Sequence, residues 1–240
     1  MLRAEARLFR REPGNLFWIV GFPPALLAIL GSVPMFREVR DDLDGLRLVD
    51  LYVPVTVLVG LIMASMQALP PVLTGYRERG VLRRMSTTPV RPSALLSAQM
   101  TLIGTAALFS ALLSLAVGRW AFDVPLPGRP AGYALALLLG VAVAVGMGAL
   151  VAAVARTAKS ATAVSSAVFF PMLFCAGVWL PVQAMPDLLA RIVGFTPYGA
   201  AALALGEAGA GDWPAWSRLA VLAGWAVALS AGASRWFRWE

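Results

Sequence analysis

The sequence predicts an all-α integral membrane protein with six transmembrane helices. Hydrophobic residues make up 59% of the 240 residues, and the mean hydropathy is +0.75. The chain has only 20 basic and 13 acidic side chains, too few to cover the surface of a soluble domain of this length. Five stretches without Asp, Glu, Lys or Arg each exceed the roughly 20 residues that cross a hydrocarbon core of about 30 Å. Together these observations exclude a water-soluble fold.

Six apolar segments define the expected spans within a single domain over residues 1–240. The five long charge-free stretches are 13–36, 51–76, 92–118, 130–155 and 160–186. The sixth, 219–234, is shorter, but it lies between Arg218 and Arg235, whose long side chains can reach the membrane interface. We therefore expect transmembrane helices at about 15–36, 51–73, 93–117, 131–155, 161–180 and 217–234.

A shorter apolar segment, Ile192 to Gly206, lies between the fifth and sixth spans. Its 15 residues are too few for a regular span, and prolines at 181, 186, 197 and 214 divide the region into short pieces. We expect residues 181–214 to form a broken extracellular segment of short re-entrant or interfacial helices.

The distribution of arginine predicts the orientation. With the N-terminus inside, the internal pieces 1–16, 74–92, 156–160 and 235–240 hold 13 basic and four acidic residues, and the external pieces hold seven and nine. This asymmetry follows the positive-inside rule and predicts that both termini are cytoplasmic. Lys159 is the only lysine among the basic residues, a bias that suggests a bacterial chain and hence the bacterial plasma membrane.

Residues 1–13 are expected to form an interfacial helix. Arg3, Arg7 and Arg10 share one stripe of such a helix, where they would contact the head groups of membrane lipids, until Pro13 turns the chain into the bilayer. A disordered basic leader that only sets the topology is the alternative.

Several chemistries are excluded by what the sequence lacks. There is no histidine and one cysteine, Cys175, so metal sites with histidine ligands and histidine proton relays are excluded. No Gly-rich turn ends in Gly-Lys-Ser/Thr, and the five long spans hold no ionisable residue that could couple an ion gradient. We expect neither an enzyme nor a bound cofactor, and energy for any uphill transport must come from another polypeptide.

Small and flexible side chains take the place of charge inside the membrane. Gly140, Ala144 and Gly148 recur every four residues, a spacing that suits either packing within the chain or a dimer seam. Methionines could line an adaptable apolar pathway or fill the core. The residues that we assign to a possible substrate path are Met63, Met66, Gln67, Phe170 and Phe174.

The loop over residues 74–92, on the predicted cytoplasmic side, carries the most information. It holds five arginines and one glutamate, and Val81, Leu82 and Met85 would form an apolar patch on a short helix that Pro89 must end. A charged surface helix with a small apolar patch suits docking of a soluble partner. A basic loop that only sets the topology fits these residues equally well.

Two motifs in this chain carry a family resemblance. Tyr76-Arg77-Glu78-Arg79-Gly80-Val81-Leu82-Arg83-Arg84-Met85, followed by Thr88-Pro89, resembles the coupling loop of the ABC-2 family of ATP-binding-cassette membrane subunits. It is similar especially to the daunorubicin and doxorubicin resistance permeases. The run from Phe170 to Pro181, then Met185-Pro186 and Thr196-Pro197, resembles the fifth span of that family and the broken helices after it. Ala176 stands where many members have serine.

The resemblance implies a permease subunit that exports a hydrophobic or amphipathic drug or natural product. ATP and its magnesium would bind to two copies of a separate ATPase, which would work with this chain and a second permease copy or homologue. Residues 76–85 would contact the ATPase. Export of a lipid-linked glycan or polysaccharide is an alternative, and so is a non-transporting membrane scaffold. The net charge of +7 divides into about +9 inside and −2 outside, so no nucleic acid is expected as a partner.

Overall fold

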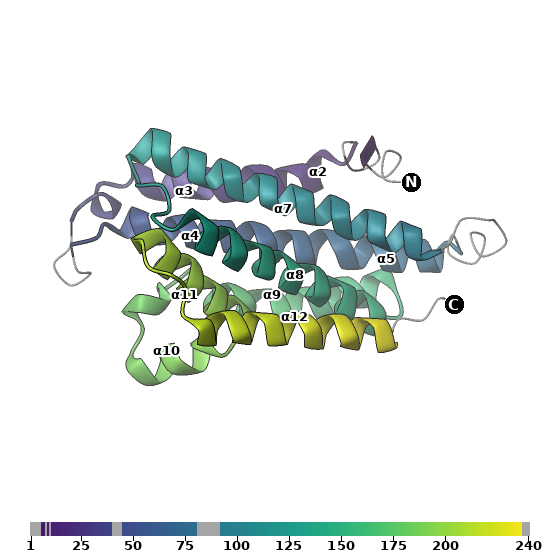
Figure 1. Ribbon diagram of the computed structural model, residues 1–240. Coiled ribbons are helices and arrows are strands. Elements are labelled where there is room, and N and C mark those ends of the chain that lie inside the picture. Colours follow the sequence, from purple (N-terminus) through teal and green to yellow (C-terminus); the bar gives the residue numbers. More distant parts are fainter. Residues whose placement is uncertain (1–5, 8, 10, 40–44, 81–91, 237–240) are drawn as a thin grey trace.

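The computed structural model describes residues 6, 7, 9, 11–39, 45–80 and 92–236. Six helical segments in this part of the chain are long and apolar enough to cross a membrane, which confirms the predicted number of spans. They lie side by side in one bundle, with the start of α2 and the end of α12 at the same end (Figure 1). We call this end, where α5 stops and α9 starts, the basic end, and the opposite end the far end. The helices in chain order are α2 (Pro13–Leu16), η1 (Phe17–Gly21), α3 (Phe22–Ser32), η2 (Pro34–Phe36), α4 (Leu48–Met63), η4 (Ala64–Ala68), α5 (Leu69–Glu78), α7 (Pro92–Phe122), α8 (Pro130–Val154), α9 (Ala158–Cys175), η5 (Val182–Ala184), α10 (Asp187–Gly194), α11 (Pro197–Ala210) and α12 (Trp216–Trp236).

The first and fifth spans end before the predicted residues 36 and 180. Span one stops at Ser32 because Val33 precedes a proline and adopts an extended conformation, with φ −78° and ψ 123°. Span five stops at Cys175, two residues before Gly177, whose φ of +85° is left-handed. Charge-free sequence therefore continues beyond the end of each helix.

The second span is longer than the predicted 51–73, and the predicted loop is correspondingly shorter. The consecutive segments α4, η4 and α5 run from Leu48 to Glu78. Arg79 already leaves the helical conformation, with a ψ of 2°, and Gly80 follows with a left-handed φ of +64°. The third span is also longer than predicted and reaches Phe122, whereas α8 and α12 match their predicted bounds to within two residues.

Two π-helical turns precede two proline pairs at the same spacing. A single residue separates the end of η1 from Pro23-Pro24, which lie in the first turn of α3. A single residue likewise separates the end of η4 from Pro70-Pro71, in the first turn of α5. A proline ring inside a helix clashes with the carbonyl four residues earlier and lacks an N–H to donate. The wider π turn moves those carbonyls away from the ring, so the span continues without a break.

Span two is the centre of the bundle. Of its most apolar window, 78% is buried, against 22% for spans five and six. The fourth span packs against it through the small-residue stripe: a Cβ on Gly148 would lie 2.5 Å from the Ser65 carbonyl oxygen, and one on Gly140 would lie 3.2 Å from Leu61. The stripe thus packs within the chain, as one of its two interpretations predicts.

The broken segment enters the bundle and turns back. α10 and α11 meet at an angle of 104°. At the start of α11 the buried Tyr198 hydroxyl lies 3.2 Å from the Ser65 hydroxyl of η4, in the middle of span two. At the other end of α11, the backbone N–H of Arg129, near the far end, donates to the carbonyl oxygen of Ala208. The Trp225 indole N–H donates to the Phe195 carbonyl oxygen at 2.9 Å, so the irregular backbone at the bend is satisfied by α12. A bend of this kind fits a re-entrant loop or a broken span, and the extracellular placement of residues 181–214 stays a prediction.

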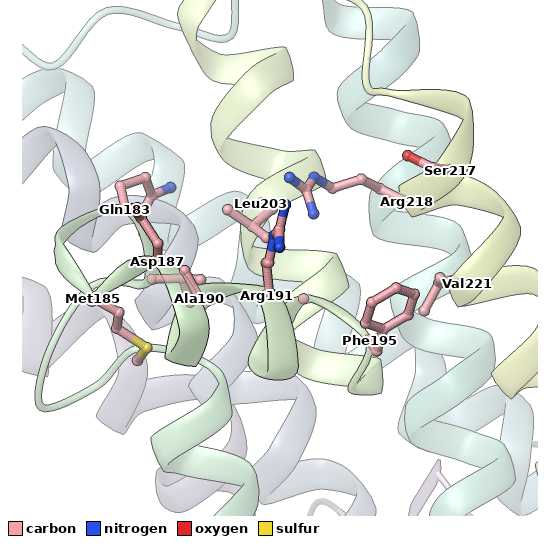
Figure 2. Close-up of a pocket in the computed structure, with 12 residues that line it drawn as sticks. Gln183, Met185, Asp187, Ala190, Arg191, Phe195, Leu203, Ser217, Arg218 and Val221 are labelled. Atoms are coloured by element: carbon pink, nitrogen blue, oxygen red, sulfur yellow. The ribbon is translucent and has the colours of Figure 1, made fainter.

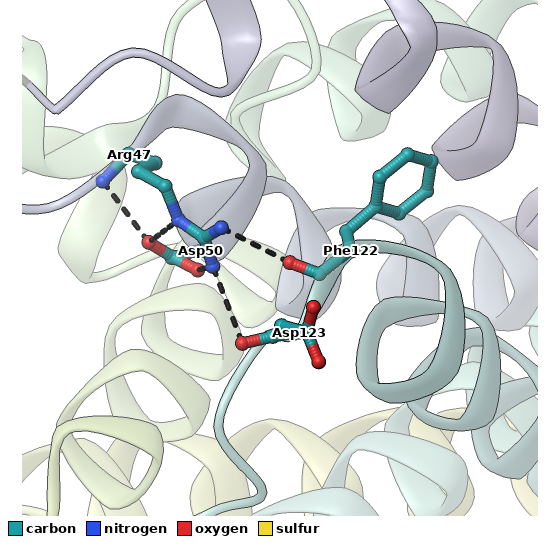
Figure 3. Close-up of polar contacts among 4 residues, drawn as sticks. All are labelled: Arg47, Asp50, Phe122 and Asp123. Atoms are coloured by element: carbon teal, nitrogen blue, oxygen red, sulfur yellow. Dashed lines mark hydrogen bonds and ion pairs between the residues drawn. The ribbon is translucent and has the colours of Figure 1, made fainter.

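A polar contact joins spans two and three at the far end (Figure 3). The Arg47 guanidinium donates to Asp50 at 2.8 and 3.1 Å, and to the backbone carbonyls of Phe122 at 3.0 Å and Asp123 at 3.4 Å. The Asp50 carboxylate raises the pKa of Arg47, which therefore stays charged. Because Phe122 ends α7, the guanidinium satisfies a carbonyl that has no partner inside its own helix.

Candidate functional site

The end of span two places the predicted coupling residues at the basic end of the bundle. Tyr76, Arg77 and Glu78 form the last turn of α5, and Arg79 and Gly80 follow it. The backbone N–H of Arg79 donates to Gly75, and that of Gly80 donates to Arg77, which closes the helix. The remaining predicted coupling residues, Val81, Leu82, Arg83, Arg84 and Met85, lie outside the described residues.

Arg77 fastens this turn to the neighbouring span. Its Nη2 donates to the carbonyl oxygen of Ala152 at 3.1 Å and to that of Ala155. Both carbonyls belong to the end of α8, where the last carbonyls of a helix have no intrahelical donor and carry its partial negative charge. The end of α5, just before residue 81, is therefore held by two spans, a link that sequence spacing alone did not indicate.

A groove opens beside this link. It has a volume of about 750 Å³ and is lined by residues from the ends of α5, α8 and α12. Arg77, Glu78 and Arg156 supply charge, and the half-exposed Val154 and Trp236 supply apolar surface. Charged and apolar groups side by side suit contact with another protein. Val154 and Trp236 were not among the predicted site residues, although a tryptophan close to Arg235 at the end of a span is a recognisable interfacial signal.

The five residues predicted to line a substrate path fall into two groups. Met63 and Met66 are buried in the core of the single chain. Gln67 is exposed on η4, and Phe170 and Phe174 are 61% and 37% exposed on α9. Since α9 packs against η4 and α5, these three side chains belong to two neighbouring helical segments. We call the exposed surface of η4 and α9 the η4/α9 face.

Beyond the first turn of α9, which carries the exposed Lys159, the η4/α9 face contains no charge. The exposed side chains of α9 beyond its first turn are Thr162, Ala163, Val164, Ser166, Ala167, Phe170, Pro171 and Phe174. Among the described residues there is also no group of three His, Cys, Asp or Glu side chains that could hold a metal ion. This surface is suited to apolar contact with lipid, with another subunit or with an apolar solute, and it carries no set of groups for covalent chemistry.

The fold and the basic end together define a multi-pass helical membrane subunit whose loop-bearing helix is anchored to a second span. Comparison with known families assigns it more closely. The ABC-2 type transporter family matches residues 1–204, which include the first five spans, and the chain belongs to this family. It is therefore the membrane permease of an ABC transporter and is not itself an ATPase. A search among curated proteins finds no match.

Proposed function

We propose that the chain forms an exporter with a second permease copy and two copies of a separate ABC ATPase. Permeases of this family work with ABC ATPase subunits, and the 76–92 loop resembles that of drug-resistance permeases. The cargo would be a hydrophobic or amphipathic drug or natural product. The exporter would lie in a bacterial plasma membrane with the basic end in the cytoplasm, as the distribution of arginine favours.

One observation supports the proposal most directly, namely the anchoring of Arg77. ATP-driven closure of the ATPases would push residues 76–85. Because Arg77 bonds to the end of α8, that displacement would move the second and fourth spans together rather than bend the loop alone. The tight packing of Gly148 against Ser65 would carry the motion along the same two spans.

The η4/α9 face supports the choice of cargo. A helix rises about 1.5 Å per residue, so Gln67 lies about 15 Å above Arg77 and Phe170 about 18 Å above the start of α9. Both would therefore lie well inside the bilayer, on a part of the surface without charge. Two such faces from two permeases would enclose a path suited to an apolar or amphipathic compound. Met63 and Met66 would contribute to the core beneath this path.

The coupling is tested with Glu78→Arg. The purified chain is reconstituted in vesicles with its ATPase, and ATP hydrolysis and uptake of doxorubicin are measured. We expect both stimulated hydrolysis and uptake to be lost, because the substitution reverses the one negative charge among the coupling arginines. Glu38→Arg, an exposed acid at the far end, serves as the control and should transport normally. Unchanged transport by Glu78→Arg would contradict the coupling assignment.

The substrate path is tested with Phe170→Ala. We expect this variant to change the KM for doxorubicin roughly fivefold, since an aromatic contact that the cargo buries contributes about 1 kcal/mol. Phe109→Ala removes a comparably exposed ring from α7, away from the η4/α9 face, and should have no effect. Equal effects of both variants would argue against the path. If the chain exports a lipid-linked glycan and takes up no drug, the glycan is the cargo instead.

The orientation is tested by labelling. In a Cys175→Ala background, Ser86→Cys should react with a membrane-impermeant maleimide only after the cells are opened. Asp212→Cys, in the exposed turn before α12, should react in intact cells. The reverse pattern would overturn the predicted topology.

A further inference from the structure

A large cavity lies at the far end of the bundle, away from the coupling loop and from the η4/α9 face. It has a volume of about 950 Å³, is open on one side, and is lined by η5, α10, α11 and the start of α12 (Figure 2). Its polar side chains are Gln183, Asp187, Arg191, Ser217 and Arg218. Cavities of this size accommodate a whole small ligand or the polar part of a larger one.

The Arg218 guanidinium is held in place. Its Nε donates to Glu207 at 2.9 Å, and the other Glu207 oxygen accepts the backbone N–H of Ala215 at 2.8 Å. The position of Arg218 is therefore fixed through Nε. Its two terminal nitrogens make no hydrogen bond to any described residue. A Cβ on Gly194 would lie 3.2 Å from Nη1, so the absence of a side chain there gives the guanidinium room beside α10.

Arg191 supplies a second guanidinium to the same cavity. It lies one helical turn before Gly194 on α10, and Figure 2 shows its side chain directed toward that of Arg218. In the described part of the chain, no ion pair or hydrogen bond involves Arg191. Asp187 also lines the cavity one turn earlier, but no ion pair joins it to Arg191. Glu207 bonds only to Nε of Arg218, so among the described residues the two terminal nitrogens of Arg218 and the whole Arg191 guanidinium have no acid bonded to them. These planar donors match a phosphate.

The surroundings place these arginines at the level of lipid head groups. α10 is amphipathic: Asp187 and Arg191 line the cavity, whereas Leu188 and Ile192 are 73% and 58% exposed. Exposed tryptophans surround the same end of the bundle, at positions 120, 179, 213 and 216. Such a belt marks the membrane interface, so the cavity opens where phospholipid phosphates lie.

We propose that this cavity binds the phosphate group of an anionic phospholipid from the leaflet at the far end, with Arg191 and Arg218 as the donors. The phosphate would lie between the two guanidinium groups, and the acyl chains would follow the exposed apolar side of α10. A soluble phosphate ester offers the same headgroup chemistry but gains nothing from that apolar surface. The site is separate from the transport path and does not require ATP.

The test is lipid binding by the purified full-length chain in neutral detergent, followed by native mass spectrometry. Phosphatidylglycerol should bind to the wild-type chain, and Arg191→Gln should weaken its Kd roughly tenfold, the effect of losing a charge-assisted hydrogen bond. The control Arg119→Gln removes another exposed arginine at the far end and should leave the Kd within about twofold of the wild type. Arg191→Gln should unfold at the wild-type temperature, because no described residue bonds to that guanidinium.

A competition arm distinguishes the source of the phosphate. Glycerol phosphate, which has the headgroup without the acyl chains, should not displace phosphatidylglycerol at equal concentration. Displacement at equal concentration would overturn the lipid assignment in favour of a soluble phosphate ester. Unchanged binding by Arg191→Gln, or an equal loss for Arg119→Gln, would overturn the site itself.

Discussion

Removing the Arg77 guanidinium should loosen the basic end of the bundle. In Arg77→Gln the carbonyls of Ala152 and Ala155 lose the donor that joins α8 to α5. A hydrogen bond from a charged donor contributes about 1.5 to 3 kcal/mol, but Arg77 is half-buried, so water can replace part of each bond. We therefore expect a loss of about 1 kcal/mol per bond, or about 2 kcal/mol in total.

This loss can be measured as a change in thermal stability. For a chain of this size 1 kcal/mol corresponds to roughly 2 to 4 °C, so the midpoint should fall by roughly 4 to 8 °C. Cys175 is the only cysteine and is half-buried, so the fluorescence of a thiol-reactive dye reports unfolding in detergent without an added label. Arg77→Lys keeps the charge but not the planar fork of donors, and should give an intermediate midpoint.

The matched control is Arg156→Gln. Arg156 lines the same groove and is exposed, and no hydrogen bond or ion pair of this side chain occurs in the described part of the protein. Its removal should shift the midpoint by less than about 1 °C, because isolated surface charges contribute little. If both glutamine variants shift the midpoint equally, the link between α5 and α8 does not stabilise the bundle, and the mechanical argument for coupling fails with it.

Two other substitutions test the packing in the middle of the membrane. Gly148→Ala would place a Cβ 2.5 Å from the Ser65 carbonyl oxygen and should lower the unfolding midpoint by several degrees. Gly224 has open space around it, so Gly224→Ala should leave the midpoint unchanged or raise it. Trp225→Phe removes the indole donor at the α10 to α11 bend and should lower the free energy of unfolding by about 1 kcal/mol. The control, Trp216→Phe, alters a largely exposed ring and should have a smaller effect. Equal stability of the two variants would show that the bend does not depend on that bond.

The sequence predicted what depends on local composition. Charge-free stretches of sufficient length identify spans wherever they occur, because the cost of placing a charge in hydrocarbon acts on each segment separately. The errors lie at helix ends, where a residue before Pro34 or a left-handed Gly177 ends the helix inside an apolar stretch, and at Glu78, which the helix reaches despite its charge. Mean hydropathy does not reveal where the backbone conformation ends a helix.

The composition thus determined that the chain is a helical membrane protein with six spans, and the family was indicated by the resemblance of its motifs. Only the tertiary structure decided that Arg77 bonds to α8, that Met66 is buried while Gln67 next to it is exposed, and that Arg191 and Arg218 converge in one cavity. Each of these facts depends on how helices far apart in the chain pack and rotate against one another. The packing and rotation of the helices depend on how side chains fit over the whole bundle, which no single segment encodes.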